Sequence, residues 1–342
     1  MSRTAPGKAA RCRAGQGYAA GLAVLALLSV LGLMLGSRAI PPAEVLRAMI
    51  RPDPASDLHV IVRSLRLPRD LLAVTAGAAL GLAGALMQSV TRNPLAEPGL
   101  LGVNAGAALA VVLGAAGLGL TSLTGYVWCA FLGAGLAGAA VFLLGRAHDS
   151  GTDPVRLVLA GAGLTILLAT LTSLLILNSG SEVLDLFRTW NTGQLEGRGL
   201  QAVRVMTLAL LLGGAIALFV APALDALAMG QDIGRTLGLK PGRIWALSCL
   251  AVMLLAGAAT ATAGPIAFVG LVAPHLARSF AGPSHRHVLP LSALFAAIML
   301  LAADILGRIV APPGEVAAGI VAALLGGPFF VHVVRRFRMV QL

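Results

Sequence analysis

Residues 66–109 read RLPRDLLAVTAGAALGLAGALMQSVTRNPLAEPGLLGVNAGAAL, and this stretch decides the fold class. Its Gly, Ala, Leu and Val residues continue without interruption over about 20 positions, which is the length of a helix that crosses a lipid bilayer. The strands of a membrane barrel are shorter and alternate apolar with polar residues. The stretch therefore predicts membrane-spanning helices.

The composition of the whole chain agrees with lipid as its solvent. Of 342 residues, 58% are hydrophobic and 11% are charged, and the mean hydropathy is +0.89. Soluble globular domains carry about 25% charged residues, so a soluble protein is excluded. The net charge of +11 comes from Lys and Arg in short clusters between apolar runs. Such clusters are typical of membrane topology, and we expect no nucleic-acid partner.

About ten apolar runs predict an all-α polytopic membrane protein. We expect a basic N-terminal segment, residues 1–17, and a single transmembrane domain, residues 18–342. The first run is too long for a signal-peptide core of about 7 to 15 residues, which favours a retained helix. The predicted spans are 18–36, 70–90, 99–118, 122–144, 155–178, 203–221, 244–262, 265–281, 288–307 and 315–334.

The distribution of Lys and Arg predicts the orientation. If both termini are cytoplasmic, 15 of the 25 basic residues fall inside and 10 fall outside. This bias has the expected sign. It is weakened by Arg63, Arg66 and Arg69, which fall together on the outside, and this group of arginines requires an explanation.

Two connections are longer than turns. Residues 178–199 are polar around Trp190, which fits either a short helix at the outer interface or a solvated loop. Residues 222–243 read PALDALAMGQDIGRTLGLKPGR and predict two short amphipathic helices on the cytoplasmic side, within 222–239. Their apolar face must pack either on the ends of the protein's own helices or on a partner.

The chain also has the pattern of two related halves. Spans two to five contain the Pro-interrupted hairpin NPLAEPG, and spans seven to ten contain a second one around GPIAFVGLVAPH. An odd number of spans separates corresponding helices, so the halves would be inverted relative to each other, as in many transporters. We therefore expect an inverted repeat.

The residues with chemical potential favour structural roles. The sequence contains no His-Glu-x-x-His, Gly-x-Ser-x-Gly or phosphate-binding loop, and its three cysteines lack metal-site spacing. We therefore expect no cofactor, no metal, no catalytic residue and no ATP site in this chain. His275 is expected to be a helix-end residue, and Asp304 to pair with Arg308 one helical turn away.

Several motifs together carry a resemblance to a known family. Residues 66–109, the segment ALAMGQDIGRTLGL, residues 264–278 (GPIAFVGLVAPHLAR), ADILGR and GGPFF occur in the order found in the permeases of ABC importers for iron-siderophores, haem and vitamin B12. The similarity covers nearly the whole chain after about residue 18. Gln231, Ser284 and Ala317 depart from the family's usual residues, the first on the presumed coupling surface.

This resemblance implies partners and their contact sites. It implies a homodimer, or a heterodimer with a close paralogue, in a bacterial inner membrane, with two cytoplasmic ATPase subunits and an extracytoplasmic binding protein. Arg66, Arg69 and Arg308 match positions that receive acidic residues of the binding protein. The ATPase is expected to contact residues from the 222–239 helices, namely Leu227, Met229, Gly230, Asp232, Ile233, Arg235 and Leu237.

Similarity to the vitamin B12 permease also places Asn93, Leu95 and Thr152 at a cytoplasmic gate, although a plain helix hairpin is the alternative. The expected cargo is an iron-siderophore, with haem and corrinoid chelates left open. A secondary transporter coupled to an ion gradient is the competing class. It is disfavoured because such proteins need acidic or histidine side chains within the membrane, and here Asp and Glu cluster at span ends.

Overall fold

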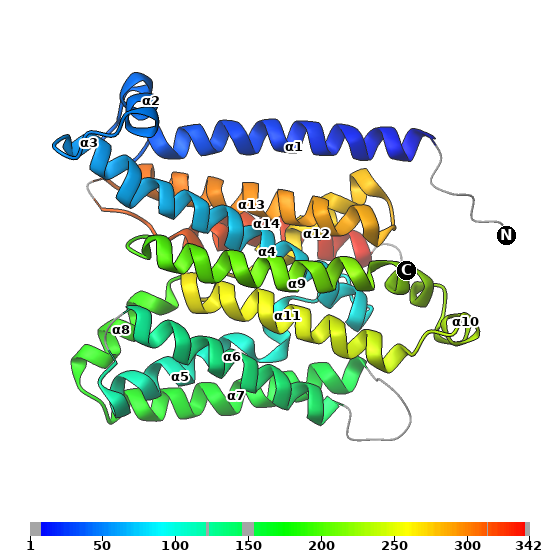
Figure 1. Cartoon of the computed structure of the whole chain (residues 1–342). Coiled ribbons are helices and arrows are strands. Elements are labelled where there is room, and N and C mark those ends of the chain that lie inside the picture. Colours follow the sequence, from blue (N-terminus) through cyan, green and yellow to red (C-terminus); the bar gives the residue numbers. More distant parts are fainter. Residues whose placement is uncertain (1–7, 121–122, 146–153, 313, 339–342) are drawn as a thin grey trace.

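The computed structural model describes residues 8–120, 123–145, 154–312 and 314–338, and these residues form helices joined by short connections (Figure 1). We use the helix bounds as they occur in the structure. The helices are α1 (Lys8–Met34), α2 (Pro42–Ile50), α3 (Asp57–Val60), the π-helix η1 (Ile61–Arg66), α4 (Leu67–Thr91), the short η2 (Pro98–Leu101), α5 (Val103–Leu118), α6 (Leu123–Gly145), α7 (Pro154–Leu177), α8 (Ser181–Asn191), α9 (Gly199–Ala228), α10 (Gln231–Thr236), α11 (Pro241–Ala263), α12 (Val269–Ala281), α13 (His285–Val310) and α14 (Ala318–Arg338).

The all-α polytopic fold is confirmed. Each of the ten predicted spans coincides with a helix, and seven helical stretches in the described residues are long and apolar enough to cross a membrane. Helices α5, α12 and the apolar part of α14 are shorter than a full crossing, so the number ten itself is not confirmed.

Two connections differ from the sequence prediction, and a third contains the short helix that was one of its two alternatives. Helix α9 continues through Pro222 as far as Ala228, so the 222–239 segment contains the end of α9 and one separate short helix, α10, and the prediction of two short helices is wrong. Between the first two spans, α2, α3 and η1 add helical structure that the sequence analysis did not anticipate. Residues 178–199 contain a helix, α8, in which Trp190 is buried.

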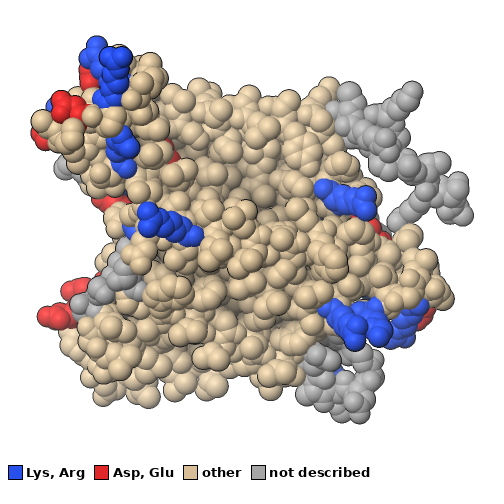
Figure 2. Space-filling model, viewed as in Figure 1, with Lys and Arg blue, Asp and Glu red and all other residues tan. Residues whose placement is uncertain are grey.

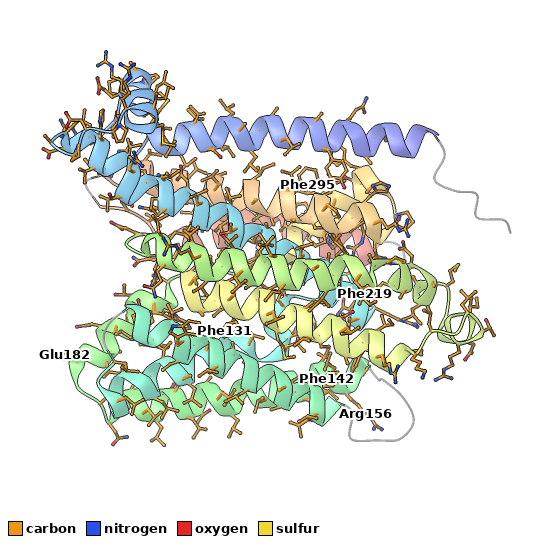
Figure 3. All side chains as sticks on the ribbon, in the orientation of Figure 1. Phe131, Phe142, Arg156, Glu182, Phe219 and Phe295 are labelled. Atoms are coloured by element: carbon orange, nitrogen blue, oxygen red, sulfur yellow. The ribbon has the colours of Figure 1, made fainter. Side chains whose placement is uncertain are left out.

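The long helices run roughly side by side, and the molecule has two ends (Figure 1). We call the end that carries α2, α3 and α8 the α2 end, and the opposite end the α10 end. Glu182 of α8 and Arg156 of α7 mark these two ends (Figure 3). Helix α4 lies in the interior and packs against α9, α11, α12 and α13, whereas α1 and α7 expose most of their apolar surface.

Glycines let the central helices approach one another to backbone distance. A Cβ atom at Gly84 of α4 would overlap the carbonyl group of Gly270 in α12, and one at Gly81 would overlap the carbonyl oxygen of Ser292 in α13. Gly106 of α5 meets Gly133 of α6 in the same way. Small residues therefore hold the bundle together at these contacts, as is typical of membrane helices.

The two Pro-interrupted hairpins meet inside the bundle. The Glu97 carboxylate accepts a hydrogen bond of 2.9 Å from the backbone N–H of Phe268, and Thr260 donates one of 2.8 Å to the side chain of Asn104. Irregular backbone at membrane depth is tolerated only where protein or a cavity surrounds it, and these contacts satisfy that condition. The inverted repeat itself stays a prediction.

We predict that Gly84→Val destabilises the protein, because the added side chain would have to push α4 away from the α12 backbone. Overpacking of this kind costs about 1–3 kcal/mol, and a backbone contact cannot relax as a side chain can. The matched control is Gly163→Val in α7, where a Cβ atom added at the glycine would meet no atom within 4 Å. Thermal unfolding in detergent measures both variants, and equal melting temperatures would contradict the prediction.

Candidate functional site

The segment around α10 projects apolar side chains into its surroundings. Gly230 separates α9 from α10 with φ of 131°, a conformation that only glycine adopts readily. Met229 directly before it and Ile233 after it are each 47% exposed, and Leu237 is 62% exposed. The protein's own helix ends do not cover these side chains. Of the two alternatives for the apolar face of this segment, packing on a partner therefore fits them better than packing on the bundle.

The remaining residues of this segment divide into two groups. Leu227 turns inward and contacts Gly234, so it holds α10 onto the end of α9. Asp232 and Arg235 are both exposed and lie 3.6 Å apart as an ion pair on the surface of α10. The structure thus places the predicted coupling residues together on one projection, with Leu227 at its base.

The hairpin between α4 and α5 begins at the α10 end. Arg92 closes α4 in a left-handed conformation with φ of 50°, and the exposed Asn93 side chain accepts a 2.9 Å hydrogen bond from the backbone N–H of Leu95. Asn93 and Leu95 therefore form one turn. Thr152, the third predicted gate residue, lies outside the described residues.

A cavity of about 510 Å³ lies beside this hairpin and the base of the projecting segment. It lies among the ends of α4, α9, α11, α12 and α13, and its wall is partly polar. His275 lines the cavity from the middle of α12, so the expectation of a helix-end residue is wrong. Its Nδ1 lies 3.2 Å from the carbonyl oxygen of Leu271 in the same helix. The lining residues are Gln88, Ser89, Val90, Arg92, Pro94, Leu224, Leu227, Ala228, Pro241, Ile244, Trp245, His275, Arg278 and His285.

The α2 end holds a buried cluster of charges, which we call the arginine–carboxylate cluster. Arg308 donates to Asp70 at 2.6 Å and to Asp304, one helical turn away on α13, at 2.9 Å. Arg69 also donates to Asp304, at 3.0 Å, and to Glu315 at 2.6 Å. The cluster comprises Arg66, Arg69, Arg308, Asp70, Asp304 and Glu315.

Burial changes the interpretation of the three arginines. Arg66 and Arg308 are 7% and 2% exposed, and the Arg69 side chain is 11% exposed, so these arginines are not an ordinary solvated edge. Arg66 donates to the carbonyl oxygens of Leu33 and Arg38 at the end of α1. In this conformation the arginines are bound to groups of their own chain, and their docking role stays a prediction.

Gly32 in α1 and Gly36, two residues beyond the end of this helix, make room for this cluster. A side chain at Gly32 would overlap the Asp70 carboxylate, and one at Gly36 would reach the Arg66 guanidinium. The Gly-x-x-x-Gly spacing here therefore accommodates charged side chains, in contrast to the backbone contacts of α4. The Gly32 carbonyl oxygen also accepts a 2.7 Å hydrogen bond from Arg308, so α1, α4 and α13 are joined at one point.

Comparison with known proteins identifies the family to which the chain belongs. The model of the FecCD transport family matches residues 24–336. The chain belongs to the FecCD transport family. It is 43% identical to the ferric enterobactin transport system permease protein of Escherichia coli (strain K12), over 92% of this chain and 93% of the relative. It is 39% identical to the Fe(3+)-citrate import system permease protein YfmD of Bacillus subtilis (strain 168), over 90% and 91%.

A solved structure supports the same assignment. The chain superimposes on an inward-facing conformation of a putative metal-chelate type ABC transporter with a TM-score of 0.81 and 28% identity, covering 93% of this chain and 98% of the other. This FecCD-family protein is therefore a membrane permease subunit of an ABC importer, and ATP is hydrolysed by a separate ATPase. The alternative of an ion-coupled secondary transporter is wrong.

Sequence analysis of the FecCD-family protein missed the partners of its charged residues. It paired Asp304 with Arg308 correctly. It did not predict the contacts of Arg69 with Asp304 or of Asp70 with Arg308, because the partners lie more than 230 positions apart in the chain. It also missed the contacts of Asp225, Ser89 and His285 at the α10 end. Only the fold brings these helix ends together.

We predict that Asp304→Asn lowers the stability of this FecCD-family protein by about 3 kcal/mol, because it leaves two buried guanidinium groups with one carboxylate fewer. The matched control is Asp185→Asn, where a 73% exposed carboxylate also lies near an arginine, Arg188, at 4.0 Å. Exposed pairs contribute about 0–1 kcal/mol. Detergent melting curves compare the two, and a similar small shift in both would contradict burial of the cluster.

Proposed function

We propose that this permease carries a ferric siderophore across the inner membrane as a homodimer, with the α10 end in the cytoplasm and the α2 end facing the binding protein. The relatives are named for ferric enterobactin, ferric citrate and iron(3+)-hydroxamate, which are all iron chelates. Enterobactin is named for the relative with 43% identity, so we place a siderophore first. Haem and corrinoid chelates stay alternatives.

The charge distribution supports this orientation. The α10 end carries exposed basic side chains over α10 and the beginning of α11, and Figure 2 shows them gathered there. Cytoplasmic loops are rich in Lys and Arg. Helix α1 begins and α14 ends at the α10 end, so both termini would be cytoplasmic (Figure 1). The exposed basic residues at this end include Arg13, Arg92, Arg156, Arg235, Lys240, Arg243, Arg286 and Arg335.

The assignment of the ATPase contact rests on the exposed apolar side chains beyond the end of α9. Met229, Ile233 and Leu237 lie outside the long apolar helices, where lipid would not cover them. A short helix with apolar anchors and a polar rim is typical of a helix that docks in a groove of a partner. We assign this surface to the ATPase subunit that supplies the free energy.

We predict that Met229→Asp or Ile233→Asp uncouples ATP hydrolysis from transport, because a carboxylate in the docking groove would be desolvated without a partner. Met229→Leu keeps the apolar contact and serves as the control. The measurements are co-purification of the ATPase and substrate uptake in proteoliposomes. Full uptake by both aspartate variants would refute docking through this surface.

The α2 end is the surface that would receive the binding protein. Residues 57–91 form one continuous helical stretch of 35 residues, which is about 52 Å long and exceeds a hydrocarbon core of about 30 Å. Its first turns therefore extend beyond the membrane and carry the exposed Arg63. Arg38, Arg47 and Arg51 are exposed beside it, and Figure 2 shows basic side chains over α2 and α3.

The two groups of arginines would act differently in docking. Exposed arginines can meet carboxylates of a partner directly, and such contacts mainly set the association rate and orientation. Arg69 and Arg308 can do so only if Asp70, Asp304 and Glu315 release them, and Arg66 only if it leaves the carbonyl oxygens of Leu33 and Arg38. We therefore assign first contact to the exposed group and keep the cluster as the layer directly beneath it.

We predict that Arg51→Glu combined with Arg63→Glu slows association of the binding protein at low salt by about tenfold or more, since steering charges change association rates by 10- to 1,000-fold. Added salt should reduce the difference between this variant and the wild type. Arg243→Glu, at the opposite end, is the control for net charge. Surface plasmon resonance on nanodiscs measures the rates, and an unchanged rate would move the docking site elsewhere.

The hairpin at residues 92–98 would narrow the cytoplasmic exit. Asn93 and Leu95 occupy its turn at the α10 end, next to the 510 Å³ cavity. Arg92 donates to the carbonyl oxygen of Leu227 at 3.4 Å, so the hairpin borders the proposed ATPase contact. This proximity favours a gate over a plain helix hairpin.

A further inference from the structure

Three side chains form a continuous chain of short hydrogen bonds at the α10 end. The Asp225 Oδ1 atom lies 2.6 Å from Nδ1 of His285, and Nε2 of the same imidazole lies 2.6 Å from Oγ of Ser89. Asp225 also accepts a 2.9 Å hydrogen bond from the backbone N–H of His285. The His285 residue is 8% exposed, so the imidazole is buried, whereas the Asp225 side chain is 33% exposed.

These three residues come from the ends of three different helices. Asp225 lies in the last turn of α9, directly before the projecting segment with Met229 and α10. Ser89 lies in the last turn of α4, directly before the hairpin with Asn93. His285 is the first residue of α13 and contacts both. The hydrogen-bonded chain thus connects the two segments that we assign to coupling and gating.

A cavity lies beside the hydrogen-bonded chain of Asp225, His285 and Ser89, and it affects how movement passes between the helix ends. The 510 Å³ cavity lies between the end of α4 and the end of α9, and Ser89, Leu224 and His285 line it. Closely packed interiors transmit displacement because side chains have no room to move, and a cavity removes that constraint. Beside the cavity, the directed contacts of Asp225, His285 and Ser89 are a route along which displacement can pass.

The arrangement resembles a Ser-His-Asp triad but does not have the setting of a hydrolase. Ser89 lies within helix α4, and its hydroxyl also lies 2.8 Å from the carbonyl oxygen of Ala85. A nucleophilic serine needs backbone N–H groups directed at an oxyanion beside it, and the N–H groups of a helix interior are already bonded. The hydroxyl has one proton, which goes either to Ala85 or to Nε2 of His285. In both cases the chain can remain hydrogen-bonded.

We propose that Asp225, His285 and Ser89 are positioning residues that transmit the movement of the ATPase-contacting segment to the gate hairpin. This inference rests on the proposed coupling and gating roles of those segments. When the ATPase displaces α10, Asp225 moves with the end of α9 and draws the start of α13 and, through His285, the end of α4. The hairpin at Asn93 follows because α4 ends only two residues before it.

The test variant is Ser89→Ala, which removes only the last bond of this chain. The matched control is Ser248→Ala, since Ser248 is also in a long helix, is fully buried and bonds to a carbonyl one turn back at 2.8 Å, but has no bond to a histidine. Both variants are assembled with the ATPase and the binding protein in proteoliposomes. We expect Ser89→Ala to lower the substrate imported per ATP hydrolysed by about tenfold, and Ser248→Ala to leave it unchanged.

A second measurement follows the movement directly. In a variant whose cysteines are replaced by alanine, spin labels at Asn93 report the hairpin and labels at Thr236 report α10, as distances across the dimer with and without ATP. We expect both distances to change with ATP in the Ser248→Ala protein. In the Ser89→Ala protein the Thr236 distance should change and the Asn93 distance should not.

The outcomes separate this inference from the function on which it rests. If the Asn93 distance still responds to ATP in the Ser89→Ala protein and import per ATP is normal, the transmission role is refuted. If Thr236 does not respond to ATP even in the control, or Met229→Asp imports normally, the coupling assignment itself fails. Asp225→Glu, which keeps the carboxylate, should import more per ATP than Asp225→Ala, and equal loss in both would also refute the role.

Discussion

The close approach of α4 to its neighbours is the constraint on which the rest of the structure depends. In lipid, apolar side chains gain little by meeting one another, so helices associate through close packing and through polar contacts. Helix α4 meets α12 at Gly84 and α13 at Gly77 and Gly81, where a Cβ atom would overlap a backbone carbonyl group of the neighbour. These contacts fix the position of α4. Its two ends then determine where the buried charges and the gate hairpin lie.

The fold was predictable because its main signals are local. Composition and run length indicated membrane helices, and every predicted span coincided with a helix. Pro222 misled the analysis because a proline inside a soluble helix normally ends it, whereas in a membrane helix neighbouring contacts compensate. Helix α2 was missed because residues 42–50 carry Glu44 and Arg47 and are too short to give a clear apolar run.

The site was predictable only in part, because its contacts are not local. The pattern around Met229 and Ile233 indicated an exposed amphipathic segment, and these side chains are indeed exposed. The arginines were recognised as unusual, but no pattern could show that Asp70, Asp304 and Glu315 neutralise them. The sequence alone does not show whether a charged side chain is solvated or paired with an opposite charge. That distinction depends on helix packing across hundreds of residues.

The two ends of the molecule differ in how they resist movement. At the α2 end, three guanidinium groups and three carboxylates are buried together, and separating them would leave charges without partners, which costs about 3–5 kcal/mol for a single broken pair. At the α10 end, helix ends border a cavity and are joined mainly by individual hydrogen bonds, which contribute about 0.5–1.5 kcal/mol each and more where Asp225 takes part. A partner that binds at the α10 end can therefore rearrange that end at a free-energy cost that its own binding can supply. Movement that begins there would reach the arginine–carboxylate cluster last, so in the proposed orientation the end assigned to the binding protein would hold its shape until the proposed gate has changed.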